Sequence, residues 1–482
     1  MNKGSGHCQK SRRWVLGAGL ASIAGAASAG GAASHHDIAG LVQSLGLGTD
    51  GYLRILLPAG SGANVAPVAE QFRHLTGIEI RITEVPVDDV DVQLALDNLS
   101  GTQTFDLALP ATFSIPDLVE DGVLAPLDGM AAYDEILASR QTSLFTTGDT
   151  FDGANYGFQT DGDAYVMFYN TDFWDAAQAR RYEDRFGAPL RVPQTWAELD
   201  QQMLWFHRPD QGQFGGMLFR NPNYVAWEWW IRFHARGIWP LAPNMTPQLA
   251  NDAGVGALED MIRASDFLAP EAANAGLFDN WNRYAHGDVY ANVGWGGSQK
   301  FFNKPGSGLR GKLAFGKTPG GLVGDQLLTT PYFNWGWNYV VLAGSSKPDL
   351  ALIFAAFATC PDMSTLAVRQ QDGFFDPFRA EHYADPGIID AYSSAFLDVH
   401  QESMETAIPD LYLARQGEYF LSLSKWIARA LNGLTAPDVA LARVEQQWNI
   451  ITAQVGRDKQ IQRWGALRSK YPTHARRLLV DL

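Results

Sequence analysis

The sequence predicts an α/β protein of two domains, from its element pattern and its length. Short apolar segments typical of strands alternate with stretches of helical spacing; these segments are Tyr52–Leu57, Ile78–Ile82 and Phe105–Leu109. Such alternation favours a parallel sheet, with ligand-binding loops at the carboxyl ends of its strands. The roughly 450 residues that follow an N-terminal leader are more than one hydrophobic core usually organises, so we expect two domains.

The first 29 residues have the features of a cleavable export signal. An apolar run, Trp14–Ala29, is rich in Gly and Ala, ends in small residues and follows four basic residues: Lys3, Lys10, Arg12 and Arg13. The segment Ser11–Leu16 is similar to the twin-arginine (Tat) motif, while Sec export stays open. The run is too short and too weakly apolar for an uncleaved membrane anchor. We therefore expect a periplasmic protein, cleaved after Ala29.

Charge and cysteine content exclude several classes of function. The leader carries four positive charges and no negative one, so its removal changes the net charge from −15 to −19. Such an acidic chain repels nucleic acid and anionic membrane surfaces. Cys8 leaves with the leader and Cys360 remains alone, which excludes an intramolecular disulfide and a cysteine-based zinc site. No later segment is apolar enough to span a membrane, so we expect a soluble mature protein.

Local patterns predict several further elements. Tyr165–Asn170 forms a strand with too little polarity to face water. Thr195 and Glu198 form a capping box at the start of a helix. Helical spacing covers residues 224–236, 419–431 and 437–455, and a short helix begins at Ile38 within a Gly- and Ala-rich arm. The pair His35-His36 in that arm could bind a metal, but no third ligand lies at a fixed spacing, so we favour the plain arm.

Two short motifs suggest a binding site. Asp161-Gly162-Asp163 is either a turn or a means of pointing the Asp163 carboxylate into a cleft, where it would accept two hydroxyl donors from a vicinal diol. Trp295 stands among Gly294, Gly296 and Gly297, which suits a stacking platform better than a core position because a ligand must reach the ring face. Trp335-Gly336-Trp337 repeats that arrangement.

The order of motifs along the chain resembles one known family. Matching segments are Phe72 with Thr76-Gly77-Ile78, Phe105-Asp106-Leu107, Gly122–Asp128, Tyr169–Asp172, Pro193–Leu199, Trp335-Gly336-Trp337 before Ser346–Ala351, and Asn432-Gly433 before Pro437–Leu441. In these the chain resembles the family 1 extracellular solute-binding proteins of ABC importers, the maltose-binding-protein-like group, over most of residues 50–455. The resemblance implies a type II-like periplasmic binding protein with two discontinuous lobes joined by a hinge.

The same resemblance implies where the domains and the site lie. We expect a signal peptide at 1–29, an arm at 30–49, an N-terminal lobe from 50–158 plus 318–380, and a C-terminal lobe from 162–314 plus 386–482. Hinge crossings are then expected near 158–162, 314–318 and 380–386. Position by position, and with Trp335 and Trp337 added from the local pattern, the predicted ligand-binding residues are Ser61, Thr112, Asp163, Tyr224, Trp227, Trp295, Trp335, Trp337, Tyr419 and Phe420.

The function implied is capture of a carbohydrate and its delivery to ABC permease subunits in the inner membrane. Gly60-Ser61-Gly62 lacks the charged residues of maltodextrin binders, and Pro110 stands where they carry a tryptophan, which favours a small sugar or polyol. We expect a monomer with no cofactor, metal or catalytic residue. The alternatives are a receptor for a polyamine or metal chelate, and a periplasmic glycosidase in which Asp106 or Asp376 partners Asp163. Several carboxylates in the cleft would favour a polyamine.

Overall fold

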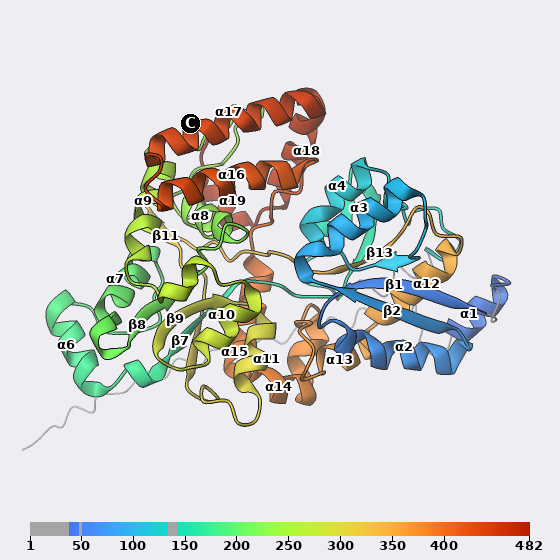
Figure 1. Ribbon diagram of the computed structural model, residues 1–482, viewed down its shortest axis with the longest axis horizontal. Coiled ribbons are helices and arrows are strands. Elements are labelled where there is room, and N and C mark those ends of the chain that lie inside the picture. The colour runs from blue at the N-terminus through green and yellow to red at the C-terminus, as the bar shows by residue number, and fades with distance from the viewer. Residues whose placement is uncertain (1–37, 48–50, 134–141) are drawn as a thin grey trace, which may run out of the picture. The chain divides into compact units, whose positions relative to one another are not determined.

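The computed structural model describes residues 38–47, 51–133 and 142–482, which two mixed β-sheets organise (Figure 1). The predicted leader, residues 1–29, lies outside the described residues, as do residues 30–37 and 48–49 of the predicted arm. The described residues all belong to one compact unit. Each sheet with its helices is called a lobe below.

The sheet of the first lobe has the order β2-β1-β3-β13-β6. Its strands are β1 (Tyr52–Pro58), β2 (Glu79–Val85), β3 (Leu107–Ala108), β6 (Gly157–Gln159) and β13 (Asn338–Val341). β1 pairs in parallel with β2 and β3, whereas β13 is antiparallel to β3 and β6. The parallel part confirms the predicted α/β class, and the distant origin of β13 makes this lobe discontinuous.

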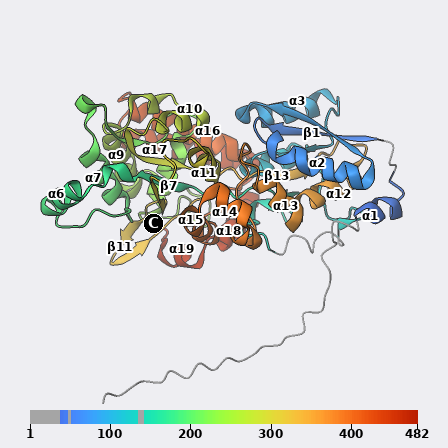
Figure 2. The same ribbon diagram turned by 90° about the horizontal axis from the view of Figure 1, so that it is seen from below.

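Helices cover both faces of the first sheet, and α2 and α3 lie on opposite sides of it (Figures 1 and 2). The helices of this lobe are α1 (Ile38–Ser44), α2 (Gly62–Thr76), α3 (Val90–Ser100), α4 (Ile115–Glu120), α12 (Pro348–Thr359) and α13 (Pro361–Val368). A small hairpin, β4 (Thr150–Phe151) with β5 (Ala154–Asn155), accompanies them. Gly77 ends α2 in the left-handed region, at φ 79°, as the sequence predicts.

The sheet of the second lobe has the order β10-β7-β9-β8. Its strands are β7 (Val166–Asn170), β8 (Phe214–Met217), β9 (Val289–Gly294) and β10 (Leu313–Lys317). β7 is antiparallel to β9 and β10, and β8 is parallel to β9. All five residues of β7 are buried, which confirms the prediction of a strand that does not face water.

The second lobe contains most of the helices, and α16 and α17 pack along one another in it (Figure 1). These helices are α6 (Ala176–Phe186), α7 (Trp196–Phe206), α8 (Val225–His234), α9 (Asp252–Ser265), α10 (Leu277–Tyr284), α11 (Gly296–Asn303), α14 (Pro386–Tyr392), α15 (Ser394–Thr406), α16 (Gln416–Leu431), α17 (Pro437–Val455), α18 (Arg457–Lys470) and α19 (Thr473–Leu478). The capping box of α7 is confirmed: Glu198 N donates to Thr195 Oγ1 at 3.2 Å, and Glu198 Oε2 accepts from Thr195 N.

The second crossing between the lobes lies later in the chain than predicted. Residues 313–317 form β10 of the second sheet, and the hairpin β11 (Gly321–Val323) with β12 (Gln326–Leu328) also stays with that lobe. Gly320 N donates to Gln194 O at 2.8 Å, and Gly320 O accepts from Trp196 N at 3.0 Å. These two bonds hold the chain at the start of α7, so it leaves the second lobe only between β12 and β13.

No single helix among the described residues has the length and apolar character to cross a membrane. One bent pair, α12 with α13, passes that test jointly by length and composition, with an angle of 67° between the two helices. Every α12 residue from Leu350 to Thr359 is buried.

Candidate functional site

Two cavities share the walls formed by Trp335 and Trp337. The smaller, called the inner pocket here, has a volume of about 30 Å³, and its wall also includes the Asp163 carboxylate. The larger, called the outer groove, has a volume of about 500 Å³. A volume of that order is typical of small-molecule sites, and the inner pocket adds space for one small polar group.

Six of the ten predicted site residues line these cavities. Asp163, Trp295, Trp335 and Trp337 line the inner pocket. Trp227 and Phe420 line the outer groove together with Trp335 and Trp337. The groove draws residues from both lobes, because α3 contributes from one side and α8 and α16 contribute from the other.

The other four predicted residues do not line either cavity. Tyr224 lies one layer behind, with its ring 6.2 Å from that of Trp335 and 5.3 Å from that of Trp227. Ser61 is buried, and the Thr112 hydroxyl is bonded to Gly336 O and Asn338 Oδ1. Tyr419 lies between α16 and α17, where its hydroxyl pairs with Thr452 Oγ1 at 2.7 Å and accepts from Gln460 Nε2 at 3.3 Å. For Thr112 and Tyr419, hydrogen bonds within the protein already occupy the groups that the resemblance assigned to a ligand.

An unusual backbone shape presents the two rings of Trp335 and Trp337. Trp335 has φ 71° and Gly336 has φ 53°, so both lie in the left-handed region. A Cβ on Gly336 would collide with the ring of Phe333, which explains the glycine between the two tryptophans. The Asp163 carboxylate holds this turn, since its Oδ2 accepts from Gly336 N at 3.1 Å. A bulky side chain at positive φ costs about 1–3 kcal/mol and is most often found at functional sites.

The glycines around Trp295 have a different purpose from the predicted one. A Cβ on Gly296 would lie 2.5 Å from the Asp376 carboxyl group, and one on Gly297 would lie 2.8 Å from Phe374. The glycines therefore let neighbouring side chains approach the backbone, instead of leaving the ring free for a ligand. Trp295 is 5 % exposed and its ring contacts that of Tyr165 at 4.7 Å, yet it still forms part of the pocket wall.

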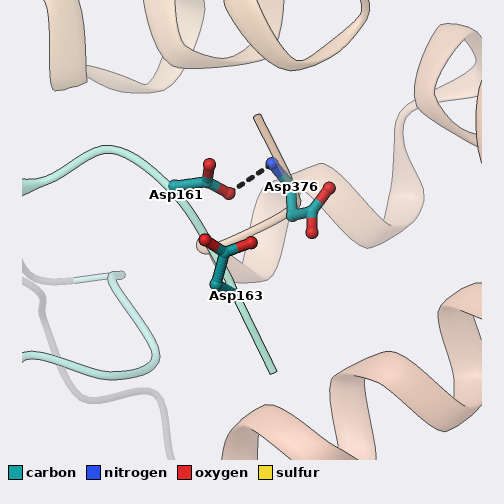
Figure 3. Close-up of side chains that lie close together, drawn as sticks. All are labelled: Asp161, Asp163 and Asp376. Atoms are coloured by element: carbon teal, nitrogen blue, oxygen red, sulfur yellow. Dashed lines mark hydrogen bonds between the residues drawn. The ribbon is translucent and has the colours of Figure 1, made fainter. Parts of the chain in front are cut away.

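Three buried carboxylates meet beside the inner pocket (Figure 3). Asp161 and Asp163 lie on the segment that leads from β6 to β7, and Asp376 lies on the one that leads from α13 to α14, so both segments run from the first lobe to the second. Carboxylate oxygens of all three lie within 4.8 Å of one another. Asp161 Oδ1 accepts from Asp376 N at 2.6 Å, and Asp376 Oδ2 accepts from Gly296 N at 2.6 Å. Asp161 Oδ2 has no partner among the described residues. The group joins two crossings to the start of α11 and is called the carboxylate triad below.

Burial raises the pKa of each carboxyl in the triad. The pKa of Asp161 is raised well above its usual value by burial and by the charge of Asp376. Burial, with the charges of Asp161 and Asp376, raises that of Asp163 in the same way. Burial raises the pKa of Asp376 to about 7, and it lowers the pKa of the nearby Lys300 to about 8. The triad therefore binds protons more readily than free aspartates do.

The triad does not match the two-carboxylate site of a glycosidase. Those enzymes hold the sugar between carboxyl groups about 5–10 Å apart, whereas Asp376 approaches Asp163 directly and lines neither cavity. The other partner considered, Asp106, directly precedes β3, accepts from Arg54 Nε at 3.2 Å and lines neither cavity. Three close carboxylates could hold a cation by count alone, but each of them already accepts a hydrogen bond from a backbone N–H group.

Sequence analysis missed several residues of the two walls. Trp281 and Phe374 line the inner pocket, and Asp88 and Asp91 line the outer groove. Asp88 follows the carboxyl end of β2, so the rule that selected the loops after β1 and β3 also applies to it. Trp281 is one of several apolar residues of the amphipathic α10, and its spacing alone cannot be told from ordinary packing.

Two lobes around an aromatic cavity with an acidic wall define a class, the solute-binding proteins. The family model described as "Bacterial extracellular solute-binding protein" matches residues 68–393. The chain belongs to this family, as the order of its motifs suggested.

Solved structures share the two-lobe fold. A solute-binding protein of Agrobacterium radiobacter in complex with ribitol has a TM-score of 0.71 at 18 % identity, and the match covers 83 % of this chain and 99 % of that one. A protein of Agrobacterium vitis with bound D-mannitol gives 0.69 at 18 % identity, covering 84 % and 99 %. Maltose-bound MalE3 of T. maritima gives 0.70 at 15 % identity, covering 83 % and 100 %. These likenesses confirm the predicted fold.

Curated relatives match over a shorter stretch. A binding protein of Brucella abortus and one of Brucella suis are each 28 % identical over 123 residues. That stretch is 26 % of this chain and 27 % of each relative's length.

Proposed function

We propose that this protein is the substrate-binding component of an ABC importer, which captures a small sugar or polyol between its lobes. The observation that carries the proposal is the pair of cavities with shared walls, which five indole rings and Asp163 line. Indole faces pack against the apolar C–H faces of a carbohydrate, and a carboxylate accepts hydrogen bonds from its hydroxyl groups. Solved structures of the same fold hold ribitol and D-mannitol.

A ligand in the outer groove would touch both lobes at once. On one side the groove is lined by Asp88 and Asp91, near the start of α3, and on the other by Trp227 and Phe420. Contacts that form only when the lobes approach each other shift the hinge equilibrium toward the closed state. The closed, loaded protein is then the form that the membrane permease receives.

Six residues are proposed as ligand contacts: Asp163, Trp227, Trp295, Trp335, Trp337 and Phe420. Tyr224 supports two of these rings from behind.

The protein acts by binding alone, without covalent chemistry, and is exported to the periplasm through the leader that carries Arg12 and Arg13. Replacement of this pair by two lysines should leave a twin-arginine precursor in the cytoplasm, which fractionation and immunoblotting would detect, whereas normal export would point to the Sec route.

A ligand screen tests the proposed function. Purified protein is heated with ribitol, D-mannitol, D-tagatose, maltose, putrescine and divalent metals, and binding is then measured by calorimetry. A carbohydrate that binds should raise the midpoint of unfolding, since a ligand at 100 times its Kd adds about 2.7 kcal/mol to the free energy of unfolding. Stabilisation by metals or by putrescine alone would overturn the carbohydrate proposal. Release of sugar from a glycoside would overturn the claim that binding is the whole function.

A further inference from the structure

Every ionisable side chain that lines either cavity is acidic. Asp163 lines the inner pocket, and Asp88 and Asp91 line the outer groove. Among the described residues, no Lys, Arg or His side chain lines either cavity. Carboxylates accept hydrogen bonds from neutral hydroxyl groups, but only a cation also gains Coulomb energy from each carboxylate that it approaches.

The inner pocket has the composition of a site for a small cationic group. Five aromatic rings line it together with one aspartate; these rings are the indoles of Trp281, Trp295, Trp335 and Trp337 and the phenyl ring of Phe374. An ammonium group is attracted to the faces of indole rings, and this attraction grows when water is excluded. A volume of about 30 Å³ admits a single terminal group such as a protonated amine.

The carboxylate triad behind the pocket brings three carboxyl groups together, so each negative charge among them is repelled by its neighbours. The Nζ of Lys300, the cation beside the triad, is held by three backbone carbonyls, those of Val368, Gln370 and Phe375, at 3.0–3.4 Å. Lys300 also lines neither cavity. A cation next to Asp163 would therefore relieve repulsion among Asp161, Asp163 and Asp376, which lie within 4.8 Å of one another.

Two pocket rings carry indole N–H groups that acceptors on a ligand could satisfy. The indole N–H groups of Trp281 and Trp335 are buried and have no hydrogen-bond acceptor among the described residues. A buried donor without an acceptor is costly, and an amine cannot satisfy it because an ammonium group only donates. Hydroxyl oxygens can accept from both rings. The pocket therefore combines a place for an amine with places for hydroxyl groups.

We propose that the ligand is a cationic carbohydrate, an aminated sugar or polyol whose ammonium group enters the inner pocket beside Asp163. This inference rests on the proposed function and narrows it from carbohydrates in general to those that carry a basic nitrogen. The hydroxyl-bearing part of the ligand lies along Trp335 and Trp337 and extends into the outer groove.

Pairs of ligands that differ in an amino group test whether the positive charge of the ligand contributes to binding. Calorimetry at pH 7 compares D-glucitol with N-methyl-D-glucamine, and D-glucose with D-glucosamine, with putrescine as an amine without hydroxyl groups. We expect the aminated member of at least one pair to bind ten times more tightly or better than its neutral partner, and more tightly than putrescine. Raising the salt concentration from 0.05 to 0.5 M should weaken the aminated ligand more than the neutral one.

Each outcome separates the two proposals. If the neutral member binds as tightly as the aminated one, the inference fails while the carbohydrate function stands. If putrescine binds best, both fail and the protein is an amine receptor. If neither pair nor putrescine binds and the broader screen yields a neutral carbohydrate, the inference alone fails. If the broader screen yields no carbohydrate, the proposed function fails as well.

Two variants test which carboxylates produce the preference for the aminated ligand. Asp163→Asn keeps an oxygen that can accept from Gly336 N, and it should reduce the preference for the aminated ligand at least tenfold because it weakens the aminated ligand more than the neutral one. Asp88→Asn tests an exposed carboxylate of the outer groove. It should lower the affinity for the aminated ligand only, by about two- to fivefold, because solvent and salt screen an exposed charge. Asp89→Asn is its matched control, since Asp89 is an exposed neighbour that lines neither cavity. Equal effects of Asp88→Asn and Asp89→Asn, with an unchanged preference in Asp163→Asn, would overturn the inference.

Discussion

Two clusters of buried charge in this protein are built in opposite ways. In the second lobe, two arginines face two carboxylates: Arg220 Nη1 lies 2.5 Å from Glu228 Oε2, and Arg232 bonds both Glu228 and Asp200 at 2.7–2.8 Å. Burial alone would raise the pKa of Glu228, but Arg220 and Arg232 hold it below its usual range. Where the lobes connect, the charge of Lys300 acts on two carboxylates of the triad, Asp161 and Asp376, and burial raises all three pKa values.

The comparison of these two clusters distinguishes buried charges that stabilise the fold from buried charges that border the candidate ligand site. The arginine network lies away from both cavities and every charge in it has a partner, so its purpose is to join α7 and α8 to the loop after β8. The triad borders the inner pocket, holds three close carboxyl groups and, among the described residues, leaves one of their oxygens without a partner. Local charge balance is thus a better guide to function here than burial of charge.

The largest expected effect is a loss of stability when one partner is removed from the arginine network of the second lobe. Glu228→Ala leaves Arg220 and Arg232, which are 7 % and 2 % exposed, with too few partners. Removal of one partner from a buried ion pair costs about 3–5 kcal/mol, which chemical unfolding followed by circular dichroism would measure. Glu259→Ala, at an exposed position on α9, is the control and should change the free energy of unfolding by less than about 0.5 kcal/mol. A loss below 1 kcal/mol for Glu228→Ala would contradict the assignment of the cluster to the fold.

The next effect concerns the pocket itself. Trp335 forms part of both cavity walls, so Trp335→Ala should weaken the best carbohydrate from the screen by about 10- to 100-fold, or roughly 1.4–2.8 kcal/mol. The measurement is calorimetric titration. Trp426→Ala provides the comparison, because Trp426 is partly exposed on α16 and lines neither cavity. Similar affinities in the two variants would remove Trp335 from the site.

The smallest effect is a pH dependence produced by the triad. The pKa of Asp376 is about 7 in the folded protein against 3.8 for an ordinary aspartate, so the folded state binds the extra proton. Stability should therefore fall as pH rises through 7, by roughly 0.5–1 kcal/mol between pH 6.5 and 7.5. Asp376→Asn should reduce this slope to the smaller contributions of Asp91, Asp117 and Asp410, whose pKa values burial raises to about 6, and urea unfolding at both pH values would show the reduction.

Two further points help to assign the pH slope to Asp376. Burial lowers the pKa values of His234, His382 and His400 to about 4, 3 and 4, so their contributions to stability arise below pH 6.5. Asp372→Asn changes an exposed residue on the same crossing and should keep the wild-type slope. An unchanged slope in Asp376→Asn would place the proton elsewhere.

Local sequence patterns predicted the elements whose signals are local. The apolar strand β7, the capping box of α7 and the bounds of α17 follow from a few adjacent residues, and the structure confirms each of them. The hairpin β11–β12 and the late second crossing could not be read in this way, because they depend on backbone bonds between Gly320 and the start of α7.

From local patterns, candidate site residues could be predicted only where a single short segment contains the whole signal. Asp163 and Trp295 stand out in their own motifs, and both line the inner pocket. Asp376 joins Asp161 across 215 positions of sequence, and no local pattern shows that contact. Thr112 and Tyr419 matched a family position, but their hydroxyl groups bond within this protein.

The rings of the inner pocket make the protein its own optical probe. Trp281, Trp295, Trp335 and Trp337 surround one small space beside ionisable carboxyl groups, and indole emission responds to nearby charge and to water. A ligand that fills this space changes both at four fluorophores together. Occupancy should then be visible in the intrinsic ultraviolet emission, so that the rates of capture and release can be followed by rapid mixing without a label.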